Sequence, residues 1–164
     1  MSFMIAENIK QKIDYWLSKY PADRKRSAIV EALLLVQEQN QGWLSEEAMN
    51  AVASYLDLLP IFVYEVATFY DMYELKPIGQ HKIAICTNLS CQLRGAEKIV
   101  EHFKARLGVG LGETTADGKF SLREVECMAA CDGAPMCQVD DRKCYPNLTQ
   151  ERVDELLKEL SKEK

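Results

Sequence analysis

Long apolar runs are missing from this sequence of 164 residues. Its longest apolar stretches, such as residues 32–36 and 58–64, fall far short of the roughly 20 residues that a membrane-spanning helix needs. Residues 1–12 also lack the basic-then-apolar order of a secretory leader. We therefore expect a cytoplasmic, reducing setting and no direct membrane insertion.

An excess of basic residues is missing as well. Lysine and arginine number 20 against 25 aspartates and glutamates, which gives a net charge of −5. The two signs are interspersed, and the short basic cluster at residues 24–26 is typical of a solvated helix face. Because nucleic-acid-binding proteins normally carry a basic face, we expect no nucleic-acid partner.

Histidine is scarce, and no Cys-x-x-Cys pair occurs. A Rieske centre needs two histidine ligands, but His81 and His102 both lie outside the cysteine loops. We expect His81 to be a surface strand residue and His102 a helix-face residue. The missing Cys-x-x-Cys pair argues against a dithiol redox site and against the tight knuckles that zinc prefers.

Cysteine, by contrast, is present six times. Cys86 and Cys91 form a Cys-x₄-Cys pair, Cys127 and Cys131 form a Cys-x₃-Cys pair, and 35 residues separate the pairs. Four thiolates suit either one tetrahedral zinc ion or an iron–sulfur cluster. The looser loops favour the wider, two-iron cluster, so these four cysteines are predicted to hold one [2Fe–2S] cluster.

The other two cysteines, Cys137 and Cys144, fall inside predicted strands. Cys137 follows Cys131 closely enough to replace a ligand in principle, but we expect both to be small buried hydrophobes. The small residues between Cys127 and Cys131 should let backbone N–H groups approach the sulfurs. Residues 133–135 should form a tight passage beneath the site.

Helical periodicity dominates the first part of the chain. Apolar residues recur at helical spacing from residue 9 to 20, from 29 to 39, after the N-cap Ser45, and after Pro60. We expect Thr68-Phe69-Tyr70 to belong to the helix core and interdomain packing first, and to a partner surface second. The interpretation is a helical bundle over residues 1–76, with a linker at residues 75–80.

Residues 77–164 have a mixed pattern. Strands are predicted at residues 82–86, 119–126, 136–139 and 142–145, with helices over residues 96–107 and after the N-cap Thr149. If the first strand, helix and second strand form a β–α–β unit, their strands are parallel and the closing hairpin is antiparallel. This thioredoxin-like layout places both cysteine pairs at the carboxyl ends of strands.

Several motifs together resemble the E subunits of NADH:quinone oxidoreductase, respiratory complex I. The resemblance covers nearly the whole chain. The matching stretches are residues 41–44 (Gln-Gly-Trp-Leu), 65–73 (Glu-Val-Ala-Thr-Phe-Tyr-Asp-Met-Tyr), 86–91, 112–120, 125–131 and 134–136.

This resemblance implies an α+β fold: an N-terminal helical bundle followed by a thioredoxin-like [2Fe–2S] ferredoxin domain. It implies that Cys86 and Cys91 hold one iron and that Cys127 and Cys131 hold the other. The family's partner is the F subunit, which binds NADH and FMN, within the peripheral arm of the complex on the cytoplasmic face of the inner membrane. The chain would hold single electrons from NADH oxidation, with no catalytic residue and no complete active site of its own.

Some points stay open. The family commonly has glycine where this chain has Ala129, which predicts a stiffer loop. The same motifs occur in the equivalent subunits of NAD-linked hydrogenases and formate dehydrogenases. From a different class, a zinc-stabilised interaction module is the remaining alternative.

Overall fold

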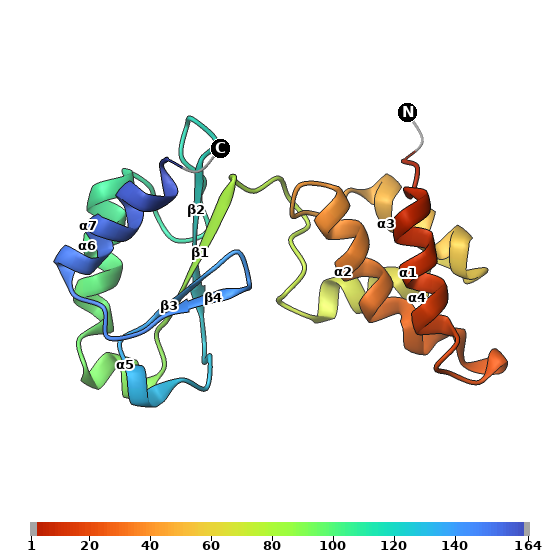
Figure 1. Ribbon diagram of the computed structural model, residues 1–164, viewed down its shortest axis with the longest axis horizontal. Coiled ribbons are helices and arrows are strands. Elements are labelled where there is room, and N and C mark those ends of the chain that lie inside the picture. The colour runs from red at the N-terminus through yellow and green to blue at the C-terminus, as the bar shows by residue number, and fades with distance from the viewer. Residues whose placement is uncertain (1–2, 163–164) are drawn as a thin grey trace. The chain divides into compact units, whose positions relative to one another are not determined.

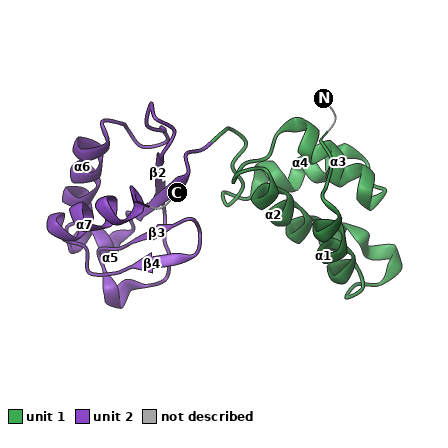
Figure 2. Cartoon of the chain, turned by 45° about the horizontal axis from the view of Figure 1, so that its top comes forward, with its two compact units in different colours: residues 1–77 green, residues 78–164 purple. Residues whose placement is uncertain are grey.

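The computed structural model describes residues 3–162. The chain divides into two compact units, Met1–Pro77 and Ile78–Lys164 (Figure 2). The first is helical and the second combines helices with a four-stranded sheet. The predicted α+β class is therefore confirmed. Within the described residues, no helix is both long and apolar enough to span a bilayer.

Unit 1 is a helical bundle (Figure 1). Its elements are α1 (Glu7–Leu17), η1 (Ala22–Ala28), α2 (Ile29–Gln39), α3 (Glu46–Leu56) and α4 (Pro60–Phe69). The predicted caps explain two of the starts: the Ser45 hydroxyl accepts a hydrogen bond from the Ala48 amide at 3.1 Å, and Pro60 opens α4. The basic cluster at residues 24–26 is solvent-exposed, as expected, but on the short helix η1 that the periodicity did not predict.

The segment after α4 is held against α2. The Gln37 side chain donates to the Met72 carbonyl at 3.1 Å and accepts from the Glu74 amide at 2.8 Å. The Tyr73 hydroxyl donates to the Val30 carbonyl at 2.9 Å. These contacts fix the last residues of unit 1 against its helical core.

The expectation that Thr68-Phe69-Tyr70 lies in the helix core is wrong. Phe69 is 78% exposed and Tyr70 is 43% exposed, and Thr68 is exposed too. Helix α4 buries Val63 and Ala67 instead, and Phe69 lies on another side of the helix.

Unit 2 contains one mixed sheet. Its elements are β1 (His81–Cys86), α5 (Leu89–Leu93), α6 (Ala96–Leu107), β2 (Phe120–Val125), η2 (Cys131–Gly133), β3 (Cys137–Val139), β4 (Lys143–Tyr145) and α7 (Gln150–Leu160). The strand order is β2-β1-β3-β4. Strands β1 and β2 are parallel, whereas β3 pairs antiparallel with both β1 and β4. The predicted β–α–β unit and closing hairpin are confirmed.

The central position of β1 buries every residue of that strand. His81, expected at the surface, is only 7% exposed, so that expectation is wrong. Its Nδ1 lies 2.9 Å from the Asp140 carboxylate, which also accepts from the Lys82 amide at 2.8 Å. Asp140 and Asp141 both have positive φ, as the tight β3–β4 turn requires.

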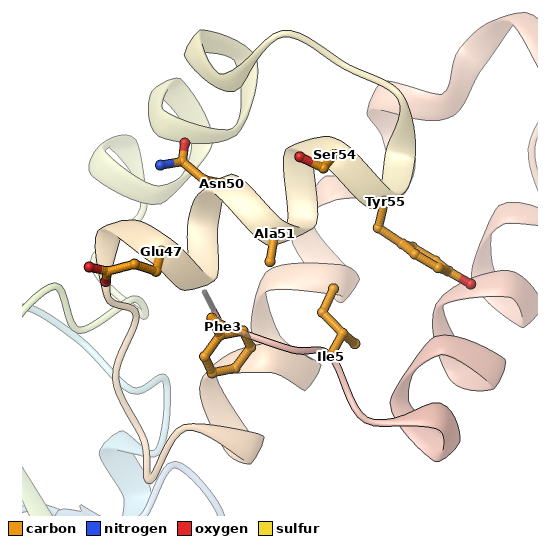
Figure 3. A pocket seen from close by; sticks show the side chains of 7 residues that line it. All are labelled: Phe3, Ile5, Glu47, Asn50, Ala51, Ser54 and Tyr55. Atoms are coloured by element: carbon orange, nitrogen blue, oxygen red, sulfur yellow. The ribbon is translucent and has the colours of Figure 1, made fainter. Parts of the chain in front are cut away.

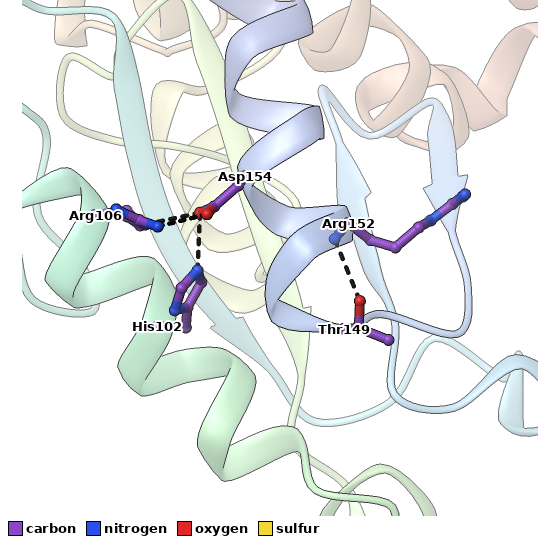
Figure 4. A network of polar contacts seen from close by, with 5 residues as sticks. All are labelled: His102, Arg106, Thr149, Arg152 and Asp154. Carbon is purple, nitrogen blue, oxygen red and sulfur yellow. Dashed lines mark hydrogen bonds and ion pairs between the residues drawn. The ribbon is translucent and has the colours of Figure 1, made fainter.

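Helices α6 and α7 lie side by side (Figure 1) and share an apolar core with the sheet. Figure 4 shows the charged network that joins them: Asp154 of α7 pairs with Arg106 and with His102 of α6, the latter at 2.8 Å. Hydrogen bonds from Arg106 and His102 lower the pKa of the Asp154 carboxyl. His102 is thus a helix-face residue, as expected.

The observed linker is shorter than the predicted one, residues 75–80. The Gly79 amide donates to the Ser121 hydroxyl at 2.7 Å, and the Gln80 amide donates to the Gly118 carbonyl at 2.9 Å. A Cβ on Gly79 would lie 2.9 Å from the backbone of Lys119 and Phe120. Residues 79 and 80 therefore already belong to unit 2.

Candidate metal centre

The first cysteine pair lies on regular elements. Cys86 is the last residue of β1, and Cys91 lies on the short helix α5. Their exposed fractions are 3% and 1%. Both belong to a small buried cluster with Ala96, Ala134 and Met136.

The second pair lies in the segment that follows β2. Cys127 comes two residues after the end of β2, and Cys131 opens η2. Both are solvent-exposed. Because β1 and β2 are parallel, their carboxyl ends meet at one edge of the sheet, and both pairs lie there.

The four thiols interact across this edge. The Cys86 sulfur lies within hydrogen-bonding reach of the Cys91 and Cys127 thiols, and Cys131 is an electrostatic neighbour of Cys91. Thus residues of three separate segments converge. No group of three or more His, Cys, Asp or Glu side chains within residues 3–162 is arranged around a single metal ion.

Backbone amides also point at the sulfurs. The Cys86 sulfur accepts hydrogen bonds from the Asn88 and Met128 amides, and the Cys91 sulfur accepts one from the Met136 amide. The Ala129 amide lies 3.3 Å from the Cys127 sulfur. The expectation that small residues would admit such bonds in the second loop is confirmed. Donors of this kind stabilise negative charge on thiolates and on a bound cluster.

The two buried thiols differ in proton affinity. Burial raises the pKa of Cys86, but hydrogen bonds from two amides and from the neighbouring thiols outweigh it, so the pKa lies below its ordinary value. Burial and the adjacent Cys86 thiolate raise the pKa of Cys91 to about 11. The Cys86 thiol therefore loses its proton more readily than the Cys91 thiol.

The passage from Gly133 to Pro135 supports the second loop. All three residues are buried, and the Ala134–Pro135 peptide bond is cis. The Asn147 amide donates to the Gly133 carbonyl at 2.6 Å, and a Cβ on Gly133 would lie 2.5 Å from the Pro146 Cβ. Only glycine fits this contact, which fixes the chain directly after Cys131.

The remaining cysteines behave differently from each other. Cys137 is fully buried, and burial raises its pKa to about 12. Cys144 is exposed, so the expectation that it would be buried is wrong. It lies on the edge strand β4, where it pairs with Gln138 rather than with Cys137.

A separate cavity of about 550 Å³ lies in unit 1 (Figure 3). It is lined by Phe3, Ile5, Glu47, Asn50, Ala51, Ser54 and Tyr55. None of these residues is a cysteine or histidine. The Tyr55 hydroxyl donates to the Asp14 carboxylate at 2.8 Å, so this polar group serves the helix packing.

Sequence reasoning missed two parts of the site. Helix α5 was not predicted, although Asn88 is a common N-cap residue and Gly95 follows the helix end. The Met136 amide was missed because its approach to Cys91 depends on how β3 is placed beside β1.

Comparisons with known proteins identify the family of this chain. Residues 13–161 match the thioredoxin-like [2Fe-2S] ferredoxin family. The chain is 44% identical to the NADH-quinone oxidoreductase E subunit of Rickettsia felis over 145 residues, which is 88% of this chain and 86% of the relative. It is 41% identical to the mitochondrial NADH dehydrogenase [ubiquinone] flavoprotein 2 of Dictyostelium discoideum, over 93% of this chain and 62% of the relative.

A solved NAD+-reducing [NiFe]-hydrogenase in the H2-reduced state contains the same fold. The TM-score is 0.70 at 22% identity, over 80% of this chain, which spans only 22% of that longer chain. The match over residues 13–161 and the 44% identity over most of both chains decide the classification. This chain belongs to the thioredoxin-like [2Fe-2S] ferredoxin family.

Proposed function

We propose that this chain is the electron-transfer subunit of an NADH:quinone oxidoreductase, and that Cys86, Cys91, Cys127 and Cys131 bind one [2Fe–2S] cluster. The observation that carries the proposal is the convergence of these thiols at one sheet edge. The domains would be the helical bundle of residues 1–76 and the thioredoxin-like domain of residues 77–164.

The donor set suits such a cluster. Four sulfurs are supplied by two short loops, and three backbone amides point at the two buried sulfurs. Buried Ala96, Ala134 and Met136 exclude water from one side. When bound, the cluster supplies one-electron chemistry, and its potential depends on these amides and on solvent exposure.

The partner in this proposal is the flavin- and NADH-binding F subunit within the peripheral arm of complex I, on the cytoplasmic face of the inner membrane. Hydride transfer from NADH to FMN would occur on that subunit. This chain would take and return single electrons. The proposal rests on the family and on 41–45% identity to subunits of that enzyme.

Electron paramagnetic resonance on the anaerobically reduced chain tests the cluster. We expect two irons and two acid-labile sulfides per chain and an S = 1/2 signal. An iron-loaded, fully reduced protein without this signal would contradict the assignment. Stoichiometric zinc without sulfide would favour the structural zinc module instead.

The identity of the assembly has a separate test. Purification of the native complex should bring down membrane subunits of the quinone-reducing enzyme. Recovery of hydrogenase or formate dehydrogenase subunits would assign the chain to one of those assemblies and leave the cluster proposal intact.

A further inference from the structure

Helix α5 shows an unusual distribution of apolar side chains. Leu89 is 68% exposed and Leu93 is 79% exposed. Among the described residues of unit 2, these are the two large apolar side chains that are exposed. Every other exposed large apolar residue belongs to unit 1.

The geometry of the helix explains why both leucines point away from the core. They are four residues apart and so lie on one face, while Cys91 between them lies on the opposite face. Cys91 is 1% exposed. One short helix therefore buries a proposed ligand on one side and presents two leucines on the other.

Three acidic residues lie on the segment that carries the second cysteine pair. Glu124, Glu126 and Asp132 are exposed and flank the second cysteine pair. This segment is adjacent to α5 because the Cys86 sulfur contacts the thiols of both Cys91 and Cys127. Arg94, the residue after Leu93, is exposed too.

We infer that Leu89 and Leu93 form the apolar centre of the docking face for the cluster's redox partner, a protein with an apolar hollow bordered by basic side chains. This inference rests on the proposed function. It goes beyond it by assigning the contact to named residues that are not ligands.

Two features identify the occupant. Electron transfer needs close approach between the redox centres. A protein that covers α5 would lie next to the proposed ligand Cys91, and a protein that covers the exposed Cys127 and Cys131 would also lie next to proposed ligands. A second copy of the chain is disfavoured, because it would bring a second acidic rim and another net charge of −5 to the interface. Apolar centres with polar rims are typical of specific protein interfaces.

The test uses the full chain with its cluster loaded, and the flavin- and NADH-binding F subunit as the probe. The Leu89→Ser/Leu93→Ser double variant should bind this subunit roughly 30-fold or more weakly, the scale expected when two anchor residues are lost. The Leu89→Met/Leu93→Met variant keeps the apolar surface and should stay within about threefold of the wild type. Both should keep the wild-type paramagnetic resonance signal.

Salt provides a second readout. Binding should weaken as ionic strength rises, and Glu126→Gln should flatten that dependence. Wild-type affinity in the double-serine variant, with its cluster signal intact, would overturn the docking inference and leave the proposed function standing. If that variant lost self-association but still bound the F subunit, the docking inference would be overturned, and the leucines would instead contact a second copy of this chain. If the wild-type chain bound no cluster, that result would instead contradict the proposed function.

Discussion

The two cysteine pairs of unit 2 lie at the same sheet edge but in different surroundings. Cys86 and Cys91 lie on β1 and α5 and are buried, whereas Cys127 follows β2, Cys131 is the first residue of η2, and both are exposed. Regular elements hold the first pair in place. The second pair lies on irregular backbone and the short helix η2, and it is open to solvent.

This difference separates buried from solvent-exposed sulfurs. The sulfurs of the buried pair accept hydrogen bonds from backbone amides and lie in an apolar cluster. In the exposed pair, the Ala129 amide lies 3.3 Å from the Cys127 sulfur. A shared cluster would therefore be asymmetric, with one iron in a drier environment than the other.

The largest expected effect comes from removing one proposed ligand of either pair. Cys91→Ala and Cys127→Ala should each abolish the reduced S = 1/2 signal and the bound sulfide, because a two-iron cluster needs all four thiolates. Iron analysis and paramagnetic resonance measure this.

Cys137→Ala and Cys144→Ala are the matched controls, because both remove a thiol of the same sheet without removing a proposed ligand. We expect wild-type iron and sulfide contents in both. Loss of the cluster in Cys137→Ala would mean that Cys137 replaces one of the four.

Alkylation of the cluster-free chain should divide the six thiols by burial. Cys127, Cys131 and Cys144 should react first with iodoacetamide. A pKa of about 12 in place of 9.0 leaves Cys137 with roughly a thousandfold less thiolate near neutral pH, so it should react last. Its rate should rise about tenfold per pH unit, because the raised pKa lies above the whole working range.

Mass spectrometry of tryptic peptides at several times and pH values measures these rates. Equal rates at Cys91 and Cys131 would contradict the distinction between a buried and an exposed pair.

Gly133→Ala should loosen the exposed pair alone. The new Cβ would lie 2.5 Å from the Pro146 Cβ, so the loop after Cys131 must shift. We expect a loss of about 1–3 kcal/mol in the free energy of unfolding and a lower iron content. Chemical denaturation and iron analysis measure both.

Gly110→Ala is the control for Gly133→Ala. Its Cβ would meet the end of the Glu113 side chain at 3.3 Å, which can move away. A similar destabilisation in both variants would show that the Pro146 contact is not the cause.

The smallest expected effect is that of Ala129→Gly in the second loop. Ala129 has a φ of 54°, a left-handed conformation that costs a non-glycine residue about 1–2 kcal/mol. Glycine avoids this cost, but its greater freedom in the unfolded chain offsets about 0.5–1 kcal/mol. The net result should be a stabilisation of about 0–1.5 kcal/mol, measured by denaturant unfolding.

The neighbouring Ala130→Gly variant provides the contrast, because Ala130 has a φ of −114°. It should be destabilised slightly. A gain in stability in both variants would show that the left-handed backbone at Ala129 is not the cause.

The order of elements could be predicted from the sequence. Helical and alternating periodicities, with caps such as Ser45 and Thr149, depend on neighbours close in the chain. The helical bundle, the β–α–β unit and the closing hairpin followed from them. Helix α5 was missed because Leu89–Leu93 is too short to show a period.

Exposure was harder to predict. His81 proved buried and Cys144 exposed, because β1 is central and β4 is an edge strand. Phe69 proved exposed because α4 packs through Val63 and Ala67. In each case the deciding contact is remote in sequence, and local pattern carries no information about it.

The sequence by itself determined which thiols are available and how far apart they lie along the chain, because spacing is a property of the covalent chain. It also determined that both pairs follow strands. Only the tertiary structure decided which pair is buried, which amides point at the sulfurs, and that two leucines of α5 face outward beside them. Those properties depend on the pairing of β1 with β2 and β3, which brings segments some forty residues apart to one edge of the sheet.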